Sequence, residues 1–199
     1  MQFFLQLPLE GLPAGSKVGG EGMLQLFYCS VDDGTCETWS PFSGTHLVRL
    51  LTGAATLAQH PAGLAPLPMR SVESWNELLD YPHPEEHEEL GLTYDYDFTK
   101  KRVSVSCAEF GIALRDLDFA MDVAETISNA EVGDKLSGWP AWIQSAEYPA
   151  CPECSRAMEL VFQVDSEDNI PHMFGDVGCG HITQCADHPH MLAFGWACS

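Results

Sequence analysis

Short apolar runs alternate with polar, glycine-containing or proline-containing stretches in the first and last thirds of the chain. Runs of this length that are rich in aromatic and β-branched residues and bounded by turn residues are typical of β-strands. Residues 54–68 contain several prolines and predict an irregular crossing segment. We predict strands at Gln2–Leu7, Met23–Ser30, Thr45–Leu51, Arg102–Ser106, Trp139–Gln144, Met158–Asp165, His181–Cys185 and Leu192–Ala197.

The middle third has a different pattern, which predicts helices. Ser71 or Ser74 can cap a short helix that ends before Pro82. Residues 84–91 begin with proline, carry acids in the first turn and end with glycine, as a helix of one or two turns does. In residues 116–129, apolar side chains recur at steps of three and four, which predicts an amphipathic helix.

Two distant parts of the chain resemble each other. Gln6 and Gln163 lie in similar apolar runs, and Cys29 and Cys185 follow the next apolar runs at nearly the same offset. A repeat of such long period indicates a duplicated half-domain and not a solenoid. The pattern therefore predicts an α+β fold, mainly antiparallel β, in one domain over 1–199. We divide this domain into an N-terminal β half (1–70), a short helical and acidic middle segment (71–130) and a C-terminal β half (131–199).

Composition changes this picture mainly through charge. The chain has 199 residues, of which 45% are hydrophobic, a normal value for a globular protein with a sizeable core. However, 29 acids against 9 lysines and arginines give a formal net charge of −20. Such a field repels nucleic acid and anionic membranes and attracts basic proteins. We expect a protein partner, although the acidity can also serve solubility alone.

The acids concentrate in the middle segment. If they converge in space, they form a surface suited to a basic protein; the alternative is an ordinary solvated face. The candidate partner-binding residues are Glu85, Glu86, Glu88, Glu89, Asp95 and Asp97.

No targeting or membrane-spanning segment is visible in the sequence. Residues 1–5 contain no basic residue, and Pro8 and Glu10 interrupt the apolar run that follows. The apolar stretch over residues 47–69 is broken by Arg49, His60 and prolines. We therefore expect a cytoplasmic protein with reduced thiols.

The strongest chemical signal is the sequence Cys151-Pro152-Glu153-Cys154, because a Cys-x2-Cys knuckle lets two thiolates reach one tetrahedral ion. Cys185 and His188 follow as Cys-x2-His, and two predicted strands lie between the pairs. A hairpin would bring the second pair beside the first, as in a zinc ribbon. We predict a structural zinc ion bound by Cys151, Cys154, Cys185 and His188. The substitutes for any wrong ligand are Cys179, His181, His190 and Cys198.

Two alternatives to zinc remain open. The thiols can be reduced core cysteines, because unpaired cysteine is readily buried. A thioredoxin-like redox pair is less favoured, since the knuckle precedes a strand and not a helix. Cys29 and Cys36 have no Cys-x2-Cys before them, so they are either small core residues or the remnant of a second site.

The remaining motifs have ordinary structural explanations. His83 and His87 could form a surface metal clip, but a solvated acidic helix is the favoured explanation. Residues 175–180 superficially resemble a phosphate-binding loop, yet they lack the lysine and the strand–loop–helix context, and we interpret them as a tight turn. Signatures of hydrolase, metalloprotease and nucleotide-binding sites are absent from the sequence, so no catalytic or cofactor-binding residue is predicted.

Several segments together resemble a known family. Residues 135–144, Lys-Leu-Ser-Gly-Trp-Pro-Ala-Trp-Ile-Gln, look like a signature of the bacterial YwqG-like family, a domain of unknown function. The knuckle, residues 160–166, Phe174-Gly175-Asp176 and Phe194-Gly195-Trp196 follow in the family's order, and Trp75 and Asp80-Tyr81-Pro82 match its central segment. The first half lacks the family's opening Gly-Gly-x-Pro segment, and some members lack the cysteines.

The resemblance implies a largely β fold of two pseudo-symmetric halves and no established enzymatic activity. Distant relatives, the programmed-cell-death-two proteins, escort a ribosomal protein, and bacterial members often adjoin toxin genes. The sequence therefore favours a non-enzymatic protein-binding module, specifically an immunity protein that neutralises a basic toxin. The alternatives are a chaperone for a basic client and a zinc- or thiol-dependent enzyme that uses Cys151 and Cys154.

Overall fold

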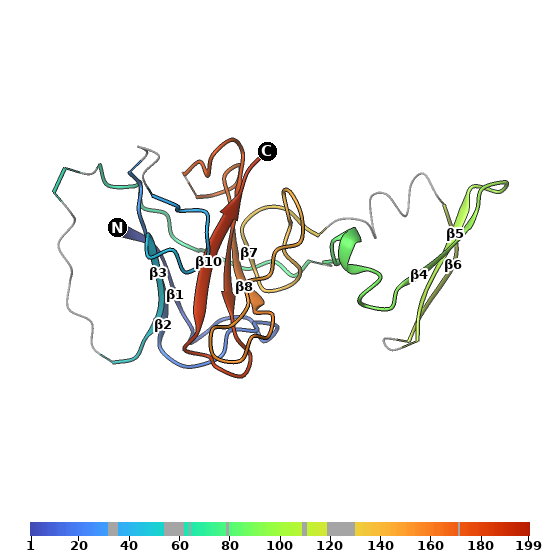
Figure 1. Ribbon diagram of the computed structural model, residues 1–199, viewed down its shortest axis with the longest axis horizontal. Helices are drawn as coiled ribbons and strands as arrows, with labels where there is room; N and C mark the ends of the chain where they lie inside the picture. Colours follow the sequence, from blue (N-terminus) through green and yellow to red (C-terminus); the bar gives the residue numbers. More distant parts are fainter. Residues whose placement is uncertain are drawn as a thin grey trace.

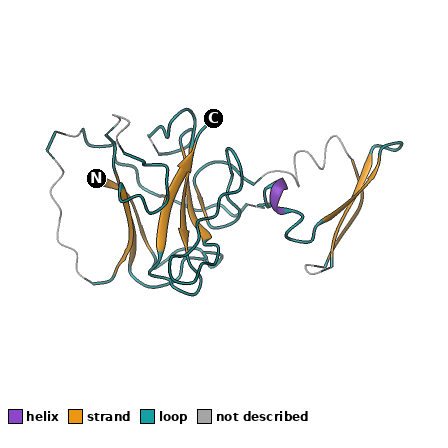
Figure 2. Cartoon of the chain, viewed as in Figure 1, coloured by secondary structure: helices purple, strands orange, loops and turns teal. Residues whose placement is uncertain are grey.

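The chain folds almost entirely as β-structure. The structure is a computed structural model, and it describes residues 1–31, 36–53, 62–63, 65–78, 80–108, 111–118, 130–170 and 172–199. Its strands form three antiparallel sheets, and the helical structure in the described residues is a single 3₁₀ turn, η1 (Pro84–Glu86) (Figure 2). The predicted α+β class is therefore wrong, and the fold is all-β.

Two of the sheets come from the two ends of the chain. β1 (Gln2–Pro8), β2 (Met23–Tyr28) and β3 (His46–Leu51) form the first sheet in that order. The second sheet has the order β10-β9-β8-β7, with β7 (Lys135–Leu136), β8 (Glu159–Asp165), β9 (Cys179–Gln184) and β10 (Leu192–Ala197). Six of these seven strands were expected from the apolar runs, and β7 was not. Figure 1 shows the two sheets next to each other.

The core lies between these two sheets. Leu24 and Leu26 of β2 face Val164, Ile182 and Phe194 of the second sheet, and all five side chains are fully buried. A sheet must cover its apolar face with another layer, and each large apolar side chain buried in this way contributes about 1.5–3 kcal/mol. This shared core makes the first and last thirds of the chain one folding body.

The first and last thirds also share a pattern of strand pairing. β1-β2-β3 and β8-β9-β10 are both antiparallel meanders. The pairing register shifts between Phe3 and Leu5 in β1, and it shifts between Leu160 and Phe162 in β8. A bulge at matching positions is a feature that duplicated elements keep, because it sets the local bend of the strand.

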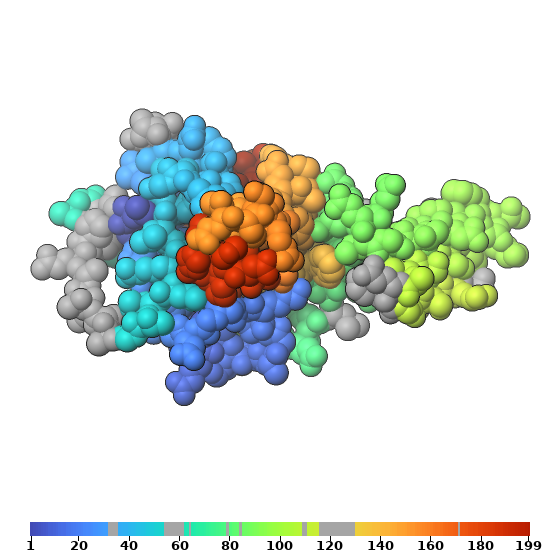
Figure 3. Space-filling model, turned by 60° about the horizontal axis from the view of Figure 1, so that its bottom comes forward, coloured from blue at the N-terminus to red at the C-terminus, as the bar shows by residue number. Residues whose placement is uncertain are grey.

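The third sheet stands apart from this body. β4 (Thr93–Asp97), β5 (Arg102–Cys107) and β6 (Ile112–Asp118) form it in that order, and Figures 1 and 3 show that it projects from the rest of the molecule. Val103 and Val105 of β5 are each 1% exposed and form a small core of their own. The sequence predicted β5, but it did not predict β4 and β6.

The predicted helical middle segment is not observed. Residues 71–78 have no helical structure, and residues 84–91 form only η1 followed by turns. Residues 116–118 belong to β6, and residues 119–129 of that predicted helix lie outside the described residues. Short helices are marginal without a packed face, and here Trp75 reaches the core from an extended segment, where its ring meets Phe162 edge-on.

The predicted strand at Trp139–Gln144 is also wrong, because this segment wraps around a buried carboxylate. Asp80 accepts hydrogen bonds from the Lys135 ammonium group (2.9 Å) and from the backbone N–H groups of Glu131 and Trp139 (both 2.7 Å). Ser137 and Gly138 both have positive φ, and a Cβ atom at Gly138 would overlap the Asp80 carboxylate. The positive φ at Ser137 and Gly138 and the hydrogen bond from the Trp139 N–H to Asp80 turn the chain away from an extended path at the start of the predicted strand.

Candidate metal centre

Cys151 and Cys154 lie in a tight turn immediately before β8. The Cys151 N–H donates to the Arg156 carbonyl (2.8 Å), and the Ser155 N–H donates to the Cys151 carbonyl (2.8 Å). Ser155 has a φ of 61°, which lets the chain reverse after the knuckle. The two thiols are thereby held on the same side of the turn.

Cys185 and His188 lie in the connection between β9 and β10. The Cys185 N–H donates to the Met191 carbonyl (3.1 Å), and the Met191 N–H donates to the His188 carbonyl (2.8 Å), so this hairpin closes tightly. Because β8 pairs with β9 in antiparallel fashion, the knuckle before β8 lies beside the end of β9, at one end of these two strands. The topology therefore brings together two ligand pairs that are about 30 residues apart in sequence.

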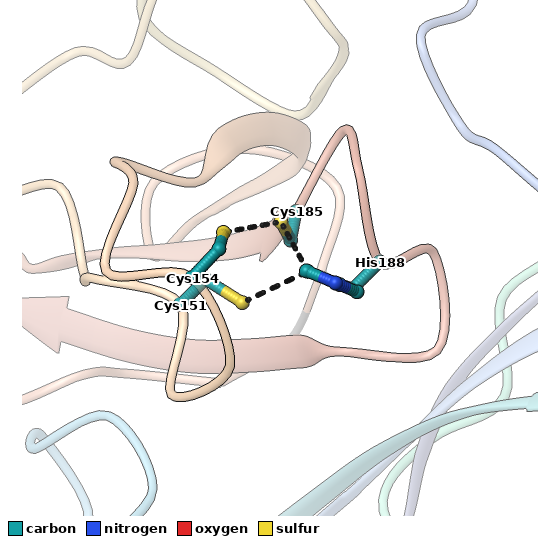
Figure 4. A group of neighbouring side chains, drawn as sticks. All are labelled: Cys151, Cys154, Cys185 and His188. Carbon is teal, nitrogen blue, oxygen red and sulfur yellow. Dashed lines mark hydrogen bonds between the residues drawn. The ribbon is translucent and has the colours of Figure 1, made fainter.

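The four ligand atoms form a compact cluster (Figure 4). They lie within 4.8 Å of one another. The His188 Nδ1 atom is 3.7 Å from the Cys151 Sγ atom and 3.6 Å from the Cys185 Sγ atom. The Cys154 and Cys185 sulfurs are 3.7 Å apart. Tetrahedral zinc with Zn–S bonds of about 2.3 Å and Zn–N bonds of about 2.0 Å needs edges of roughly 3.5–3.8 Å, so the cluster fits this ion.

The surroundings of the cluster favour the ionised, thiolate form of Cys151. Burial opposes ionisation of the Cys151 thiol, but the backbone N–H groups of the knuckle and the side chains of Cys185 and His188 lower its pKa to about 6. Hydrogen bonds to Cys185 and Cys151 raise the pKa of His188. Thiolates are the metal-binding form of cysteine, and a bound ion displaces the remaining ligand protons.

Glu153 lies inside the knuckle and orients the histidine ligand. Its carboxylate is 3.4 Å from the His188 Nε2 atom, on the side of the ring opposite the sulfurs, and 2.6 Å from the His190 Nε2 atom. Metal-binding histidines commonly donate their second N–H to a carboxylate, which fixes the tautomer and raises the basicity of the ligating nitrogen. The sequence analysis did not identify this role, although a glutamate between the two cysteines was a visible signal.

Replacing Glu153 with alanine is expected to weaken zinc binding by about 10- to 100-fold while leaving the fold intact. The carboxylate that holds His188 is lost, but all four ligands remain. Competition with a chromophoric chelator measures this change directly.

The matched control is Glu159→Ala, because Glu159 is an exposed acid at the start of β8 whose carboxylate lies 3.9 Å from the Lys17 ammonium group. It removes the same charge from the same sheet, and zinc affinity should change less than about twofold. Equal losses in both variants would contradict a specific role for Glu153.

The substitute ligands lie elsewhere or play other roles. Cys179 and His181 are buried side by side, with 3.7 Å between the sulfur and the Nε2 atom, at the other end of β9. Burial lowers the pKa of His181 to about 3 and raises the pKa of Cys179. His190 contacts Glu153, and Cys198 lies near Gly175, so neither joins the cluster.

The other predicted metal candidate is used structurally. Both ring nitrogens of His87 have partners: Nε2 is 3.0 Å from the Pro82 carbonyl, and Nδ1 is 2.6 Å from the Tyr94 hydroxyl. Among the described residues, no group containing His83 and His87 could hold an ion.

The six predicted partner-binding acids do not form one uniform surface. Glu86 is only 7% exposed, and its carboxylate accepts hydrogen bonds from the Tyr148 hydroxyl (2.5 Å) and the His83 N–H (3.0 Å). Asp97 pairs with Lys100 at 2.9 Å, and this contact lowers the pKa of Asp97. The remaining four are exposed: Glu85, Glu88, Glu89 and Asp95.

The cluster is chemically closed. Four protein ligands complete a tetrahedron, whereas catalytic zinc sites keep one position for water or substrate. Its geometry therefore suits a structural ion that joins the knuckle to the β9–β10 hairpin.

Among the described residues, no helix is long and apolar enough to cross a membrane.

Comparison with known proteins identifies a family but no activity. A family model described as "Domain of unknown function (DUF1963)" matches residues 1–185, which include three of the four ligands. "Uncharacterized protein YpfL" of Salmonella typhimurium is 44% identical over 34 residues. That match covers 17% of this chain and 8% of that protein, so the chain spans only a small part of this relative's length. No solved structure matches the chain.

Proposed function

The chain belongs to the DUF1963 family of unknown function, and from this premise we propose that it is a non-enzymatic protein-binding module with a basic protein partner. We further propose that it is a YwqG-like member of the family and acts in the cytoplasm. The zinc centre has a supporting role in this proposal, because its closed coordination suits stability and not chemistry.

The observation that carries the proposal is the charge of the segment leading to the third sheet. Residues 71–99 contain no lysine or arginine. Their acids are Glu73, Glu77, Asp80, Glu85, Glu86, Glu88, Glu89, Asp95 and Asp97. Glu85, Glu88 and Glu89 are exposed around η1, at the place where the third sheet leaves the main body (Figure 1). Asp80 and Asp97 pair with Lys135 and Lys100. Exposed acids clustered like Glu85, Glu88 and Glu89 attract basic proteins and raise their association rates.

The sharper form of the proposal is toxin immunity, in which the exposed acids cover the basic site of a folded toxin. The second form is an escort for a basic client, supported by the same charge. The two forms differ in the partner's state: an immunity protein binds a folded toxin in a defined complex, whereas an escort binds a nascent or unfolded basic segment.

Binding is tested with the purified protein and the product of a neighbouring gene at low and high salt. Titration calorimetry measures the affinity, and stopped-flow kinetics measures the association rate. We expect one tight complex whose association rate falls steeply as salt screens the charges. The double variant Glu88→Lys/Glu89→Lys should slow association by at least tenfold.

The matched control is Glu10→Lys/Glu21→Lys, which changes the net charge equally at exposed positions in the first third of the chain. This control should change the association rate only modestly. If both double variants have the same effect, only the overall charge matters and the acidic segment is not the binding surface. Processing of a substrate by the zinc-loaded protein would overturn the non-enzymatic proposal itself.

A further inference from the structure

Cys29 occupies in the first sheet the place that the metal ligand Cys185 occupies in the second. Each cysteine directly follows the middle strand of its meander, β2 or β9. The Cys29 N–H donates to the Thr45 carbonyl (3.0 Å), one residue before β3, just as the Cys185 N–H donates to the Met191 carbonyl (3.1 Å), one residue before β10. The two hairpins therefore close in the same way on equivalent cysteines.

Cys36 and Cys29 form a pair of neighbouring thiols in the first sheet, at the place that corresponds to Cys185 and His188 in the second sheet. The Cys36 sulfur is 3.5 Å from the Cys29 sulfur, and both residues are half-buried. Cys36 comes from the connection between β2 and β3, just as His188 comes from the connection between β9 and β10. Among the described residues, Cys29 and Cys36 belong to no group of three or more side chains that could hold an ion. Two thiols alone do not complete a tetrahedral zinc site.

The connection that carries Cys36 lies against the edge of β10. The Trp196 N–H donates to the Trp39 carbonyl (3.2 Å), and the two indole rings meet edge-on with centroids 6.4 Å apart. A Cβ atom at Gly195 would come within 3.0 Å of both the Trp39 carbonyl oxygen and the Pro41 side chain, so the glycine allows this close approach. The segment therefore covers an edge of the second sheet that would otherwise be open to pairing.

We propose that Cys29 and Cys36 are a redox modification site, at which a low-molecular-weight disulfide converts the two thiols into an intramolecular disulfide. One cysteine thiolate attacks the small disulfide, forms a mixed disulfide and releases one small thiol. The second cysteine then displaces the other small thiol and closes the Cys29–Cys36 bond. Two protons and two electrons leave the protein, and the small disulfide becomes two thiols. The new bond holds the 36–41 segment on β10.

The experiment uses the fully reduced, zinc-loaded protein in glutathione buffers of increasing oxidation, followed by acid quenching, alkylation and tryptic mapping. The tryptic peptide 18–49 contains Cys29 and Cys36 as its only cysteines. We expect this peptide to escape alkylation and to lose two hydrogen atoms in mass. The Cys154 and Cys185 thiols are a matched pair at 3.7 Å, and they should stay unoxidised while zinc is bound.

Hydrogen exchange at the Trp196 amide supplies the second measurement. It should slow at least fivefold on oxidation, because the Trp39 carbonyl is then held in place. The Cys36→Ser variant should stop at a mixed disulfide on Cys29 and show no slowing. The proposal is overturned if peptide 18–49 remains fully alkylated, if wild-type protein stops at the mixed disulfide, or if Trp196 exchange is unchanged by oxidation.

Discussion

Replacing Cys151 with serine is expected to abolish stoichiometric zinc binding and to lower the free energy of unfolding by at least about 3 kcal/mol. Cys151 is 1% exposed and contributes one of four ligands that lie within 4.8 Å of one another. Without it, the cluster that could hold an ion between the knuckle and the β9–β10 hairpin keeps only three ligands, two of them thiols. Metal analysis and urea unfolding of the same preparation measure both effects.

Chelation of the wild-type protein should reproduce the loss of stability, and added zinc should restore it. The control Cys29→Ser changes an equivalent cysteine in the first sheet, outside the cluster, and should retain one zinc ion per chain. The prediction fails if purified protein contains no metal and if Cys151→Ser unfolds at the same urea concentration as the wild type. In that case the four residues would be reduced core side chains, the alternative considered from the sequence.

The second large effect is expected at Asp80, where Asp80→Ala should destabilise the protein by about 3–5 kcal/mol. The substitution leaves the Lys135 ammonium group buried without its partner, because the Asp80 and Lys135 side chains are only 15% and 11% exposed. It also removes the acceptor for the Trp139 and Glu131 amides. Burial lowers the pKa of Lys135, while the hydrogen bond and the charge of Asp80 raise it. Loss of the carboxylate should therefore lower that pKa further.

An exposed ion pair of equal length provides the control. Lys100 and Asp97 are also 2.9 Å apart, but their side chains are 74% and 41% exposed, so Asp97→Ala should have a much smaller effect on urea unfolding than Asp80→Ala. Equal effects of the two substitutions on urea unfolding would contradict the role given to Asp80. The Asp80→Ala/Lys135→Met double variant should recover part of the lost stability, because it no longer buries an unpaired charge.

The wrapping of residues 135–144 around Asp80 gives a physical reason for two segments that supported the family resemblance. Lys135 pairs with the carboxylate, and Gly138 leaves room for it. Trp139 donates its N–H to Asp80, and Ala141 donates its own to the Gln163 side chain (2.8 Å). These positions accordingly carry a structural requirement that connects the middle of the chain to β8, and they do not indicate a catalytic site.

Local sequence patterns were sufficient to locate six of the seven strands of the two terminal sheets and the four residues that could hold a metal ion. Strand periodicity and burial are properties of short segments, so β1, β2, β3, β8, β9 and β10 could be located from their apolar runs. The ligand spacing within each pair is also local, and one antiparallel pairing was enough to bring the two pairs together.

The secondary structure of the middle of the chain and the environment of each acid depended on tertiary contacts that local patterns do not specify. Residues 116–118, predicted as the start of a helix, belong to β6 because they pair with β5 in a hairpin, and this pairing overrides the helical pattern. Glu86 turned inward because Tyr148, 62 residues away, donates a hydrogen bond to it, and Glu153 turned toward His188 because β8 pairs with β9. Such roles depend on contacts between distant segments, and local sequence patterns contain no information about which distant partner a side chain will meet.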